Sequence, residues 1–516
     1  EYSYVKERAF GELLTLKLNS GREGRTVIRR RGMEIYNTLT RQKEKFVPRE
    51  AGKVGIYVCG PTTYNYIHIG NARPLVFFDT VRRYFRYRGY QVEYIQNFTD
   101  IDDKIINRAR EEGVDPLKLS EKFVAEYFRD ADALNVERAD VHPRVTEHMN
   151  EIIDLIAVLL KKGNAYVVEG DVYFDVTSFS GYGKLSRRTL DEMLAGARVE
   201  VDPRKKNPVD FALWKAAKPG EPSWPSPWGP GRPGWHIECS AMSLKYLGTN
   251  FDLHGGGMDL IFPHHENEIA QSEAATGEPF ARYWLHNGFI TVNEEKMSKS
   301  LGNFFLVREV LKKFPPLVVR FFLLSTHYRS PLDFDEEKVA AAGRGWERLK
   351  NTVLAVEEAC RQRTLRPVGN GRDQDYLEGV KRIRRQFEEA MDDDFNTALA
   401  IASCFELARE ANIYLNEEAA PAEEALFRTK ELFEDFSRVL GLFKKDERGR
   451  TASGGEEEDG SELVEALVQL LLQVRQEARL KKDWALADRI RDGLKAVGII
   501  VEDTQQGTRW KKASRS

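Results

Sequence analysis

The feature that most constrains this fold is a strand–helix–strand pattern near the start of the chain. Residues 55–59 are β-rich and run into a turn of Gly, Pro and Asn, residues 73–88 have the spacing of an amphipathic helix, and residues 90–97 read as a second strand. Strands joined by a helix at this spacing form a βαβ unit, which requires a parallel sheet. We therefore predict an α/β domain with a parallel sheet of the nucleotide-binding type.

The rest of the chain does not continue this alternation, so several domains are expected. At 516 residues the chain is too long for a single hydrophobic core. Residues 166–234 hold short strands and a stretch rich in Pro, Gly and Trp, which predicts an insertion between two halves of the sheet. Apolar positions at helical spacing cover residues 330–441, whereas residues 447–462 have almost no apolar side chain and predict a flexible linker.

The first 32 residues differ from the rest of the chain. They hold eight Lys or Arg and four Asp or Glu, without hydrophobic periodicity. The acidic residues argue against an organelle transit peptide. We expect an extension outside the fold, with Met33 as the first residue of the folded part.

Composition limits the class of protein. Apolar residues make up 41% and charged residues 31% of the chain, as in ordinary soluble globular proteins. A net charge of -3 excludes a uniformly cationic nucleic-acid binder but leaves room for local basic patches. Four cysteines do not form a disulfide framework, and no apolar run approaches the roughly 18 residues of a membrane span. We expect a cytoplasmic protein without a membrane partner.

A short motif, His68-Ile-Gly-Asn71, follows the first predicted strand and opens the helix. Backbone N–H groups and the positive end of the helix dipole make a helix start a natural phosphate site. His68 and Asn71 can donate hydrogen bonds to phosphate oxygens, and Gly70 lets the backbone approach a nucleotide. Taken alone, a match of four residues is explained better by a histidine that caps a turn.

A second motif, Lys296-Met-Ser-Lys-Ser300, lies on a stretch rich in Ser and Gly. Its lysines, Lys296 and Lys299, can move onto a triphosphate and offset the charge that develops on pyrophosphate. The alternative is a solvated loop with ordinary surface lysines, but the composition of the motif favours function. Because both motifs occur on one chain, the purely structural explanations become remote.

Four residues far apart in the sequence carry side chains that zinc prefers. Cys59, Cys239, His264 and Glu268 supply two thiolates, an imidazole and a carboxylate, although no short Cys-x-x-Cys spacing is present. His264 and Glu268 are four apart and so share one face of a helix, whereas Cys59 and Cys239 are expected at the ends of two strands. The commoner role of a free cysteine is that of a small buried hydrophobe, so the set stays open on spacing alone.

The two motifs together resemble the paired signature of class I aminoacyl-tRNA synthetases. In the fourth position Asn71 stands where the general pattern has His, and an amide can make a similar contact. Within that class, the chain resembles the cysteinyl-tRNA synthetases from Met33 to about Trp510. The further segments that carry this resemblance are Tyr57-Val-Cys-Gly-Pro-Thr62, Gly234-Trp-His-Ile-Glu-Cys-Ser240, residues 254–268 (HGGGMDLIFPHHENE) and residues 498–510 (GIIVEDTQQGTRW).

The resemblance implies a fold class and a division into domains. We expect an α/β fold in which a Rossmann-type parallel-sheet catalytic domain is split by an insertion, followed by an all-α anticodon-binding bundle and a small mixed α/β C-terminal domain. The expected segments are the extension (1–32), the first half of the catalytic domain (33–165), the connective insertion (166–234), the second half with the zinc site and the lysine loop (235–310), a stem-contact region (311–349), the bundle (350–445), the linker (446–462) and the C-terminal tRNA-binding domain (463–516).

The resemblance also implies roles for individual residues. The expected zinc ligands are Cys59, Cys239, His264 and Glu268, whereas Cys360 and Cys404 are expected to be buried hydrophobes. The residues expected to act in catalysis are His68, Asn71, Lys296 and Lys299. The residues expected to bind ATP are Thr62, His68, Gly70, Asn71, Gly256, Gly257, Asp259 and Lys299, and those expected to bind the amino acid are Thr99, Trp235 and His254.

Some of these assignments have alternatives that the sequence leaves open. A turn explains the run from Gly256 to Asp259 nearly as well as a ribose contact does. A core position is as good an explanation for Trp235 as a place in the pocket. His236, His254 and His265 could bind the substrate carboxylate or support the zinc ligands, and no individual role is assigned to them.

The implied reaction is the two-step ligation of L-cysteine to tRNA(Cys), with ATP and Mg²⁺ as co-substrate. The cysteine carboxylate attacks the α-phosphorus of ATP, pyrophosphate leaves, and the terminal adenosine of the tRNA takes the cysteinyl group. Packing separates substrates that differ by about one methylene by only about 1–3 kcal/mol, whereas zinc strongly prefers a thiolate to the neutral hydroxyl of serine. One zinc ion per chain is thus expected to select the thiol, and the protein is expected to be a monomer.

Two alternative functions remain open. A related ligase could adenylate cysteine by the same chemistry and pass it to an amino sugar, although it could dispense with a long helical C-terminal part. A catalytically silent RNA- or zinc-binding paralogue is the other alternative, and the intact lysine motif argues against it.

Overall fold

The computed structural model describes most of the chain. The described residues are 32–196, 202–292, 295–296, 304–362, 364–369, 371–444, 451, 459–496, 499–504 and 507–512. They fall in two compact units, Glu1–Thr451 and Ala452–Ser516. Apart from Gly32, the predicted N-terminal extension lies outside these residues. No described helix is long and apolar enough to cross a membrane.

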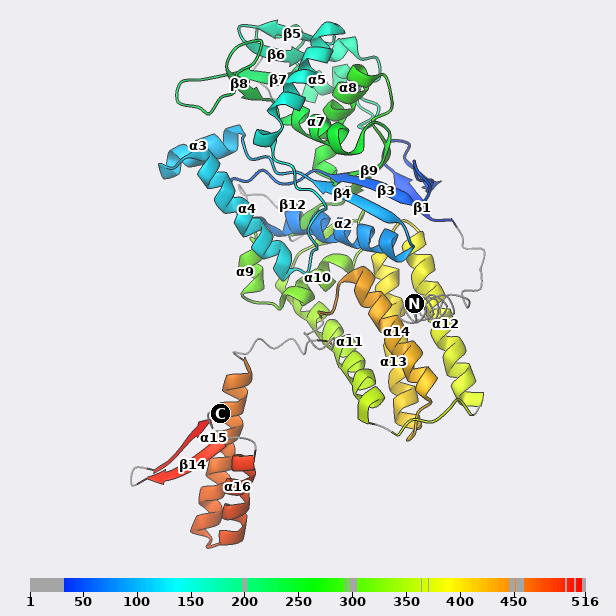
Figure 1. Cartoon of the computed structure of the whole chain (residues 1–516), viewed down its shortest axis with the longest axis vertical. Coiled ribbons are helices and arrows are strands. Elements are labelled where there is room, and N and C mark those ends of the chain that lie inside the picture. Colours follow the sequence, from blue (N-terminus) through cyan, green and yellow to red (C-terminus); the bar gives the residue numbers. More distant parts are fainter. Residues whose placement is uncertain are drawn as a thin grey trace, which may run out of the picture. The chain divides into compact units, whose positions relative to one another are not determined.

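A four-stranded parallel sheet lies at the centre of the larger unit (Figure 1). Its strands, in the order β10-β9-β3-β4, are β3 (Lys53–Val58), β4 (Gln91–Gln96), β9 (Phe251–Gly257) and β10 (Ala281–Asn287). β3 pairs with β4 on one side and with the much later β9 on the other. The order of the strands along the sheet reverses at β3. At such a point the carboxyl ends of the strands form a crevice that can bind a ligand.

The helix between β3 and β4 confirms the predicted βαβ unit but begins earlier than the sequence suggested. Helix α2 spans Ile69–Tyr87, whereas the predicted helix begins at residue 73. Gly70 and Asn71 belong to the predicted turn, yet both lie within the helix. Pro74 is the sixth residue of α2 and cannot donate the hydrogen bond that another residue would make there to the carbonyl of Gly70. The first predicted motif therefore forms the opening turn of α2.

The two faces of the sheet carry separate apolar cores. Side chains alternate along β3, so Ile56 and Val58 enter one core and Tyr57 enters the other. The first core contains the apolar face of α2 and continues into the C-terminal helices of this unit, and the second continues into the insertion. In Figure 1 the insertion and the C-terminal helices accordingly lie on opposite sides of the sheet.

The insertion forms an antiparallel sheet in the order β5-β6-β7-β8. Its elements are β5 (Ala165–Val168), β6 (Asp171–Phe174), α6 (Leu190–Gly196), β7 (Phe211–Ala216) and β8 (Gly231–Pro233). Three helices precede it in the chain: α3 (Asp103–Glu112), α4 (Pro116–Ala133) and α5 (Met149–Lys161). Two follow it: α7 (Trp235–Leu247) directly after β8, and α8 (Glu266–Thr276) after β9.

Helix α7 corrects one expectation, because Cys239 lies inside this helix and not at the end of a strand. Every residue from Ile237 to Ser243 is buried. A helix that is buried on all sides shows no amphipathic period, so sequence periodicity could not distinguish it from a strand. Cys59, in contrast, follows directly after β3 as expected.

The C-terminal part of the larger unit is helical, as predicted. Its elements are β11 (Ile290–Val292), β12 (Glu295–Lys296), α9 (Val307–Leu311), α10 (Pro316–Leu324), β13 (Leu332–Asp333), α11 (Glu336–Gln362), α12 (Gly371–Asp392), α13 (Thr397–Glu417) and α14 (Glu423–Leu440). Cys404 is buried on α13, and Cys360 is partly buried on α11.

A buried ionic cluster joins these helices to the sheet domain. Asp79 of α2 accepts from Arg82, Arg83 and Arg320, with N–O distances of 2.6, 2.8 and 2.7 Å. Arg320 of α10 also donates to the carbonyl of Leu440 at 2.7 Å, at the end of α14. The cluster thus ties α2, α10 and α14 together at one point.

The smaller unit has its own core. It contains α15 (Asp459–Leu480), α16 (Trp484–Ala496) and an antiparallel hairpin of β14 (Ile499–Thr504) and β15 (Gly507–Lys512). Val468, Leu472, Leu494 and Ile499 pack together. β14 corresponds to the predicted short strand, whereas β15 was not predicted because its sequence, GTRWKK, lacks an apolar alternation.

Candidate active site

A cavity of about 350 Å³ opens at the carboxyl ends of the parallel strands. Gln96 ends β4, Cys59 follows β3, Gly257 ends β9 and Asn287 ends β10, and all four line it. The other described residues on its wall come from the start of α2, from α4 and α7, and from the segments that follow the four strands. The cavity therefore occupies the position where open α/β sheets bind ligands.

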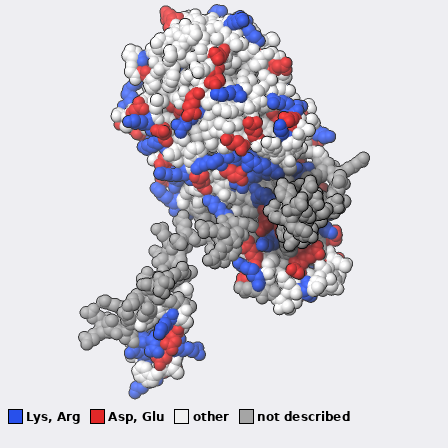
Figure 2. All heavy atoms as spheres, viewed as in Figure 1, with Lys and Arg blue, Asp and Glu red and all other residues white. Residues whose placement is uncertain are grey.

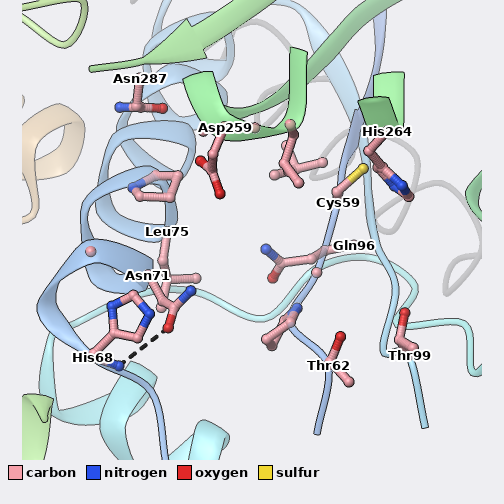
Figure 3. Close-up of a pocket in the computed structure, with 18 of the residues that line it drawn as sticks. Cys59, Thr62, His68, Asn71, Leu75, Gln96, Thr99, Asp259, His264 and Asn287 are labelled. Carbon is pink, nitrogen blue, oxygen red and sulfur yellow. Dashed lines mark hydrogen bonds between the residues drawn. The ribbon is translucent and has the colours of Figure 1, made fainter. Parts of the chain in front are cut away.

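The first turn of α2 forms one side of this cavity. His68, Gly70 and Asn71 all line it, and the Asn71 side chain accepts from the His68 backbone N–H at 3.2 Å (Figure 3). This bond ties the helix start to the residue that precedes it. The backbone N–H groups of His68, Ile69 and Asn71 are bonded within the protein, so the turn offers the His68 imidazole and the Asn71 amide to phosphate oxygens.

The end of β9 approaches the site closely. A side chain on Gly256 would lie 2.9 Å from the ring of His265, so only glycine fits there without a shift. Gly256, Gly257 and Asp259 line the cavity, and Asp259 points into it between the two sides (Figure 3). The predicted nucleotide-binding residues of this run therefore face the same space as His68 and Asn71.

On the opposite side, the four predicted metal ligands converge. Their ligand atoms all lie within 4.8 Å of one another. The Sγ atoms of Cys59 and Cys239 are 3.8 Å apart, and Nε2 of His264 lies 2.9 Å from Oε1 of Glu268. Two sulfurs, one imidazole nitrogen and one carboxylate oxygen at such separations match the donor set and size of a zinc site.

A second set of residues also converges on Cys59 and Glu268. Nε2 of His265 lies 3.3 Å from Sγ of Cys59, and Nε2 of His254 lies 2.8 Å from Oε2 of Glu268. The two sets differ in where they face. Cys59, Cys239 and His264 line the cavity, whereas His254 and His265 are fully buried and are not among its lining residues as far as the structure describes the chain. The set with Cys239 and His264 is thus the one that a ligand in the cavity can reach.

The remaining histidines support these ligands from behind. His236 Nδ1 lies 3.0 Å from Nδ1 of His264, and His265 Nδ1 lies 2.8 Å from Nε2 of His286. His254 holds the second oxygen of Glu268 and stacks on the ring of Trp284 at 4.4 Å. Such outer partners orient metal ligands and fix their tautomers. His254, predicted as an amino-acid contact, is placed behind Glu268 by the structure.

The electrostatic potential within the cluster is negative. Burial alone would lower the pKa of His264, but the charges of Glu268 and Cys239 raise it to about 10. A hydrogen bond from Cys59 lowers the pKa of Cys239 to about 6 against the effect of burial. Burial would raise the pKa of Glu268, yet His254 and His264 hold it well below its usual range. The potential at the centre of these four side chains therefore favours a bound cation.

Two predicted substrate residues lie next to the metal ligands. The Trp235 ring stacks on His264 with centroids 4.4 Å apart and an interplanar angle of 26°, and it is 37% exposed. Thr99 is buried and donates from Oγ1 to Oε2 of Glu238 at 2.9 Å. Thr99, Trp235 and Thr62 all line the cavity.

Sequence reasoning missed Glu238 and Asn97. Glu238 is 1% exposed and holds the Thr99 hydroxyl. The Asn97 Oδ1 accepts from the Gly60 backbone N–H at 2.9 Å and lies 3.7 Å from Sγ of Cys239. A carboxylate directly before Cys239 was the available sequence signal for Glu238, but its burial, which makes a partner necessary, is known only from the structure. Nothing in the sequence pointed to Asn97.

The lysine motif is only partly described. The backbone of Lys296 belongs to β12, which pairs with β11 through Thr291. Residues 297–303, including the predicted Lys299, lie outside the described residues. The roles predicted for both lysines stay predictions.

Three family models match the chain, one for each major part. Residues 45–344 match the model described as tRNA synthetases class I (C) catalytic domain. Residues 386–444 match the DALR domain, and residues 463–510 match the cysteinyl-tRNA ligase anticodon binding domain.

Relatives with similar sequences cover almost the whole chain. A cysteine–tRNA ligase of Pelotomaculum thermopropionicum is 68% identical over 487 residues, which are 93% of this chain and 100% of that protein. A cysteine–tRNA ligase of Desulforamulus reducens is 65% identical over 489 residues, with the same coverage.

Solved structures agree on the fold. A Mycobacterium tuberculosis methionyl-tRNA synthetase in complex with methionyl-adenylate aligns with a TM-score of 0.56 and 16% identity, over 76% of this chain and 90% of that one. This likeness, together with the parallel sheet and the helices after it, confirms the predicted α/β fold class. By its three matching family models and its close relatives, the chain belongs to the cysteine–tRNA ligases, a family of class I aminoacyl-tRNA synthetases.

Proposed function

We propose that this protein activates L-cysteine with ATP and transfers the cysteinyl group to the terminal adenosine of tRNA(Cys). One observation carries the proposal. Cys59 and His264 lie on one side of the cavity and the first turn of α2 on the other, with Asp259 between them (Figure 3). A thiol-selecting group and a phosphate-binding helix start thus face one space, which is what joining cysteine to a nucleotide requires.

In the activation step, the protein acts by positioning its substrates. The cysteine carboxylate oxygen attacks the α-phosphorus of ATP, and Mg²⁺-pyrophosphate leaves, so no protein nucleophile is needed. His68 and Asn71 donate to phosphate oxygens, and Gly256, Gly257 and Asp259 hold the adenosine. Lys296 and Lys299 stabilise the charge that develops on pyrophosphate. Thr62 contacts the nucleotide where it meets the amino acid.

The cluster of Cys59, Cys239, His264 and Glu268 fits one zinc ion. Its donor atoms lie close enough for shared coordination, and His236 and His254 hold two of the ligands from behind. When bound, zinc would hold the substrate sulfur as a thiolate, which the hydroxyl of serine cannot match. Trp235 stacks beside this position and Thr99 lines it, so both contribute to the amino-acid pocket.

The second step needs the rest of the chain. Helices α11 to α14 and the smaller unit would bind the tRNA, with residues 311–349 against its stem and residues 446–462 as a linker. Figure 2 shows basic side chains gathered across the middle of one face of the larger unit. In the smaller unit Lys481, Lys482 and Arg489 are exposed, whereas Arg475 is 5% exposed and is less suited to contact RNA. We further propose that the enzyme is a cytoplasmic monomer.

Cysteine-dependent ATP–pyrophosphate exchange, followed by charging of tRNA(Cys), tests this function. We expect both reactions, because activation and transfer need the same adenylate. Absence of exchange would contradict the proposal outright. Exchange without tRNA charging would instead favour the amino-sugar ligase, and that outcome is checked with glucosamine-type acceptors.

A further inference from the structure

Arg73, the fifth residue of α2, is a cation buried behind the wall of the reaction cavity. Its side chain is 1% exposed, and burial lowers its pKa to about 10, so it keeps its charge at neutral pH. Within the described parts of the chain, no carboxylate forms an ion pair with it, and burial is the cause of its lowered pKa. A buried charge is costly unless other groups satisfy it, so Arg73 needs several hydrogen-bond acceptors.

Four backbone carbonyl groups supply these acceptors. Nη1 of Arg73 donates to the carbonyls of Gly288 at 2.8 Å and Phe289 at 3.1 Å, directly after β10. Nη2 donates to the carbonyls of His327 at 3.2 Å and Ser330 at 2.6 Å, in the segment between α10 and β13. The rigid fork of a guanidinium can hold two chain segments at once, whereas a lysine ammonium is a single point with three donors.

The segment 327–330 is itself fixed by the bundle of helices that follows it. Asp394, at the junction of α12 and α13, accepts from the Tyr328 hydroxyl at 2.8 Å and from Nε of Arg329 at 2.7 Å. The carbonyl of Tyr328 in turn accepts from the backbone N–H of Gly288 at 2.8 Å. This segment therefore provides a fixed point of attachment for the arginine and for the cavity wall at Gly288.

The two segments that Arg73 holds lead into the small sheet that carries the start of the lysine motif. They continue into β11 and β13, which pair in parallel, and β11 pairs on its other edge with β12. The backbone of Lys296 lies in β12 opposite Thr291 of β11. Arg73 belongs to the helix whose start brings His68 and Asn71 to the cavity. One side chain thus joins the helix start to the base of this sheet.

We propose that Arg73 is a positioning residue for the activation step, because it sets the distance between the first turn of α2 and the lysine motif. Under the function proposed above, on which this inference rests, His68 and Asn71 bind phosphate while Lys296 and Lys299 stabilise pyrophosphate. Such groups act on developing charge only where they are held in place beforehand, and a misplacement of about 1 Å can cost about 100-fold in rate. Arg73 does not touch the substrates itself, since it is not among the described residues that line the cavity.

Arg73→Lys in the full-length protein keeps the charge and removes the fork. We expect the kcat of cysteine-dependent pyrophosphate exchange to fall by about 30–100-fold. The KM values for cysteine and ATP should change by less than about threefold, because the lost interaction acts in the transition state. Zinc content should equal that of wild type, since none of the four predicted ligands contacts the arginine.

Arg320→Lys is the matched control. Arg320 is equally buried and also donates to backbone carbonyls, those of Leu440 and Leu134, but it holds no residue of the cavity wall. It should lower the midpoint of denaturant unfolding and leave the kcat of the folded enzyme within about twofold of wild type. A purely structural role for Arg73 predicts this same behaviour for Arg73→Lys.

Gly288→Ala tests the same wall without changing the arginine. Its added methyl group would lie 2.6 Å from the carbonyl oxygen of Ser330, so the wall has to shift away from segment 327–330. We expect the same pattern as for Arg73→Lys, a lowered kcat with KM values close to those of wild type. This variant keeps the inference testable if Arg73→Lys does not fold.

A double-mutant cycle shows whether Arg73 acts through the lysine motif. Lys296→Ala should lower kcat much less in the Arg73→Lys protein than in wild type, because the lysine is already out of place there. Losses in kcat that simply multiply would overturn the inference, and so would a wild-type kcat in Arg73→Lys or, if that variant does not fold, in Gly288→Ala. Failure of the proposed function would look different, because the wild-type protein would then show no cysteine-dependent exchange.

Discussion

At the scale of single residues, the predicted metal ligands show that a site depends separately on the identity of its residues and on their position in the fold. Thiol, imidazole and carboxylate groups suit zinc by their chemistry, but only the family resemblance turned this scattered set into a prediction. Their placement follows from the fold, because Cys59 follows β3, Cys239 lies in α7, and His264 lies in the turn Ile261–His265 that leads into α8. Only the sheet and these two helices bring the four within 4.8 Å.

Replacing one ligand tests whether zinc selects the amino acid. Cys239→Ser should lose zinc and the preference for cysteine over serine together, because a neutral hydroxyl is a poor zinc ligand. The loss of zinc affinity should exceed the about 10–100-fold that removal of an outer partner costs. Metal content and pyrophosphate exchange with cysteine and with serine measure the two effects. Cys360→Ser, on α11 away from the site, is the control. Normal cysteine selectivity in zinc-free Cys239→Ser would refute the selection argument.

At the scale of elements, the buried cluster around Asp79 joins α2, α10 and the end of α14. Burial would raise the pKa of Asp79, but Arg320, Arg83 and Arg82 hold it well below its usual range. A carboxyl group with a lowered folded-state pKa stabilises the fold above its unfolded pKa of about 3.9, and this stability is lost as pH falls below that value. The junction between the sheet domain and the C-terminal helices should therefore weaken in acid.

Asp79→Asn should lower the free energy of unfolding by about 3–5 kcal/mol at pH 7, because it leaves buried guanidinium groups without their anion. The difference from wild type should begin to shrink as the pH falls below about 4, because unfolded wild type then takes up a proton at Asp79 while the folded carboxylate stays ionised. Denaturant unfolding of both proteins at several pH values measures this difference in the free energy of unfolding. Asp154→Asn, on the exposed face of α5, is the matched control. A difference that stays constant down to pH 3 would contradict this account.

At the scale of the whole molecule, the reaction site and the smaller unit belong to separate compact bodies. The cavity is built from the larger unit, whereas the smaller unit has its own core around Leu472 and Leu494. Activation of cysteine uses no residue beyond Thr451 in the described site. Binding of the tRNA is the step expected to use both units.

A chain that ends after Thr451 should therefore keep cysteine-dependent pyrophosphate exchange within about threefold, since the larger unit has its own cores. Its kcat/KM for tRNA charging should fall by at least about tenfold, because exposed cationic contacts with the RNA are lost. Its charging should also depend less steeply on salt than that of the full chain. Exchange and charging at two salt concentrations measure these effects, and an unchanged KM for tRNA would contradict them.

The elements with a clear hydrophobic periodicity were predictable from the sequence, and those without it were not. The βαβ unit, the insertion and the helices after residue 330 were predictable because alternation, turn residues and helical spacing are local properties. Helix α7 was misread because every residue from Ile237 to Ser243 is buried, and β15 was missed because its sequence lacks an apolar alternation. In the site, Glu238 and Asn97 were not predicted because their roles depend on tertiary contacts. Glu238 contacts Thr99, and Asn97 contacts Gly60 and Cys239.

The sequence by itself determined the chemistry available to this protein: which groups can bind phosphate, which suit a soft metal, and which family the motifs resemble. The tertiary structure decided which histidines line the cavity: His264 faces it, whereas His254 and His265 are buried behind it against Glu268 and Cys59. It also brought the carbonyl groups of two distant segments to the guanidinium of Arg73. The physical reason is that side-chain chemistry is local, whereas the direction a side chain faces depends on how distant segments pack.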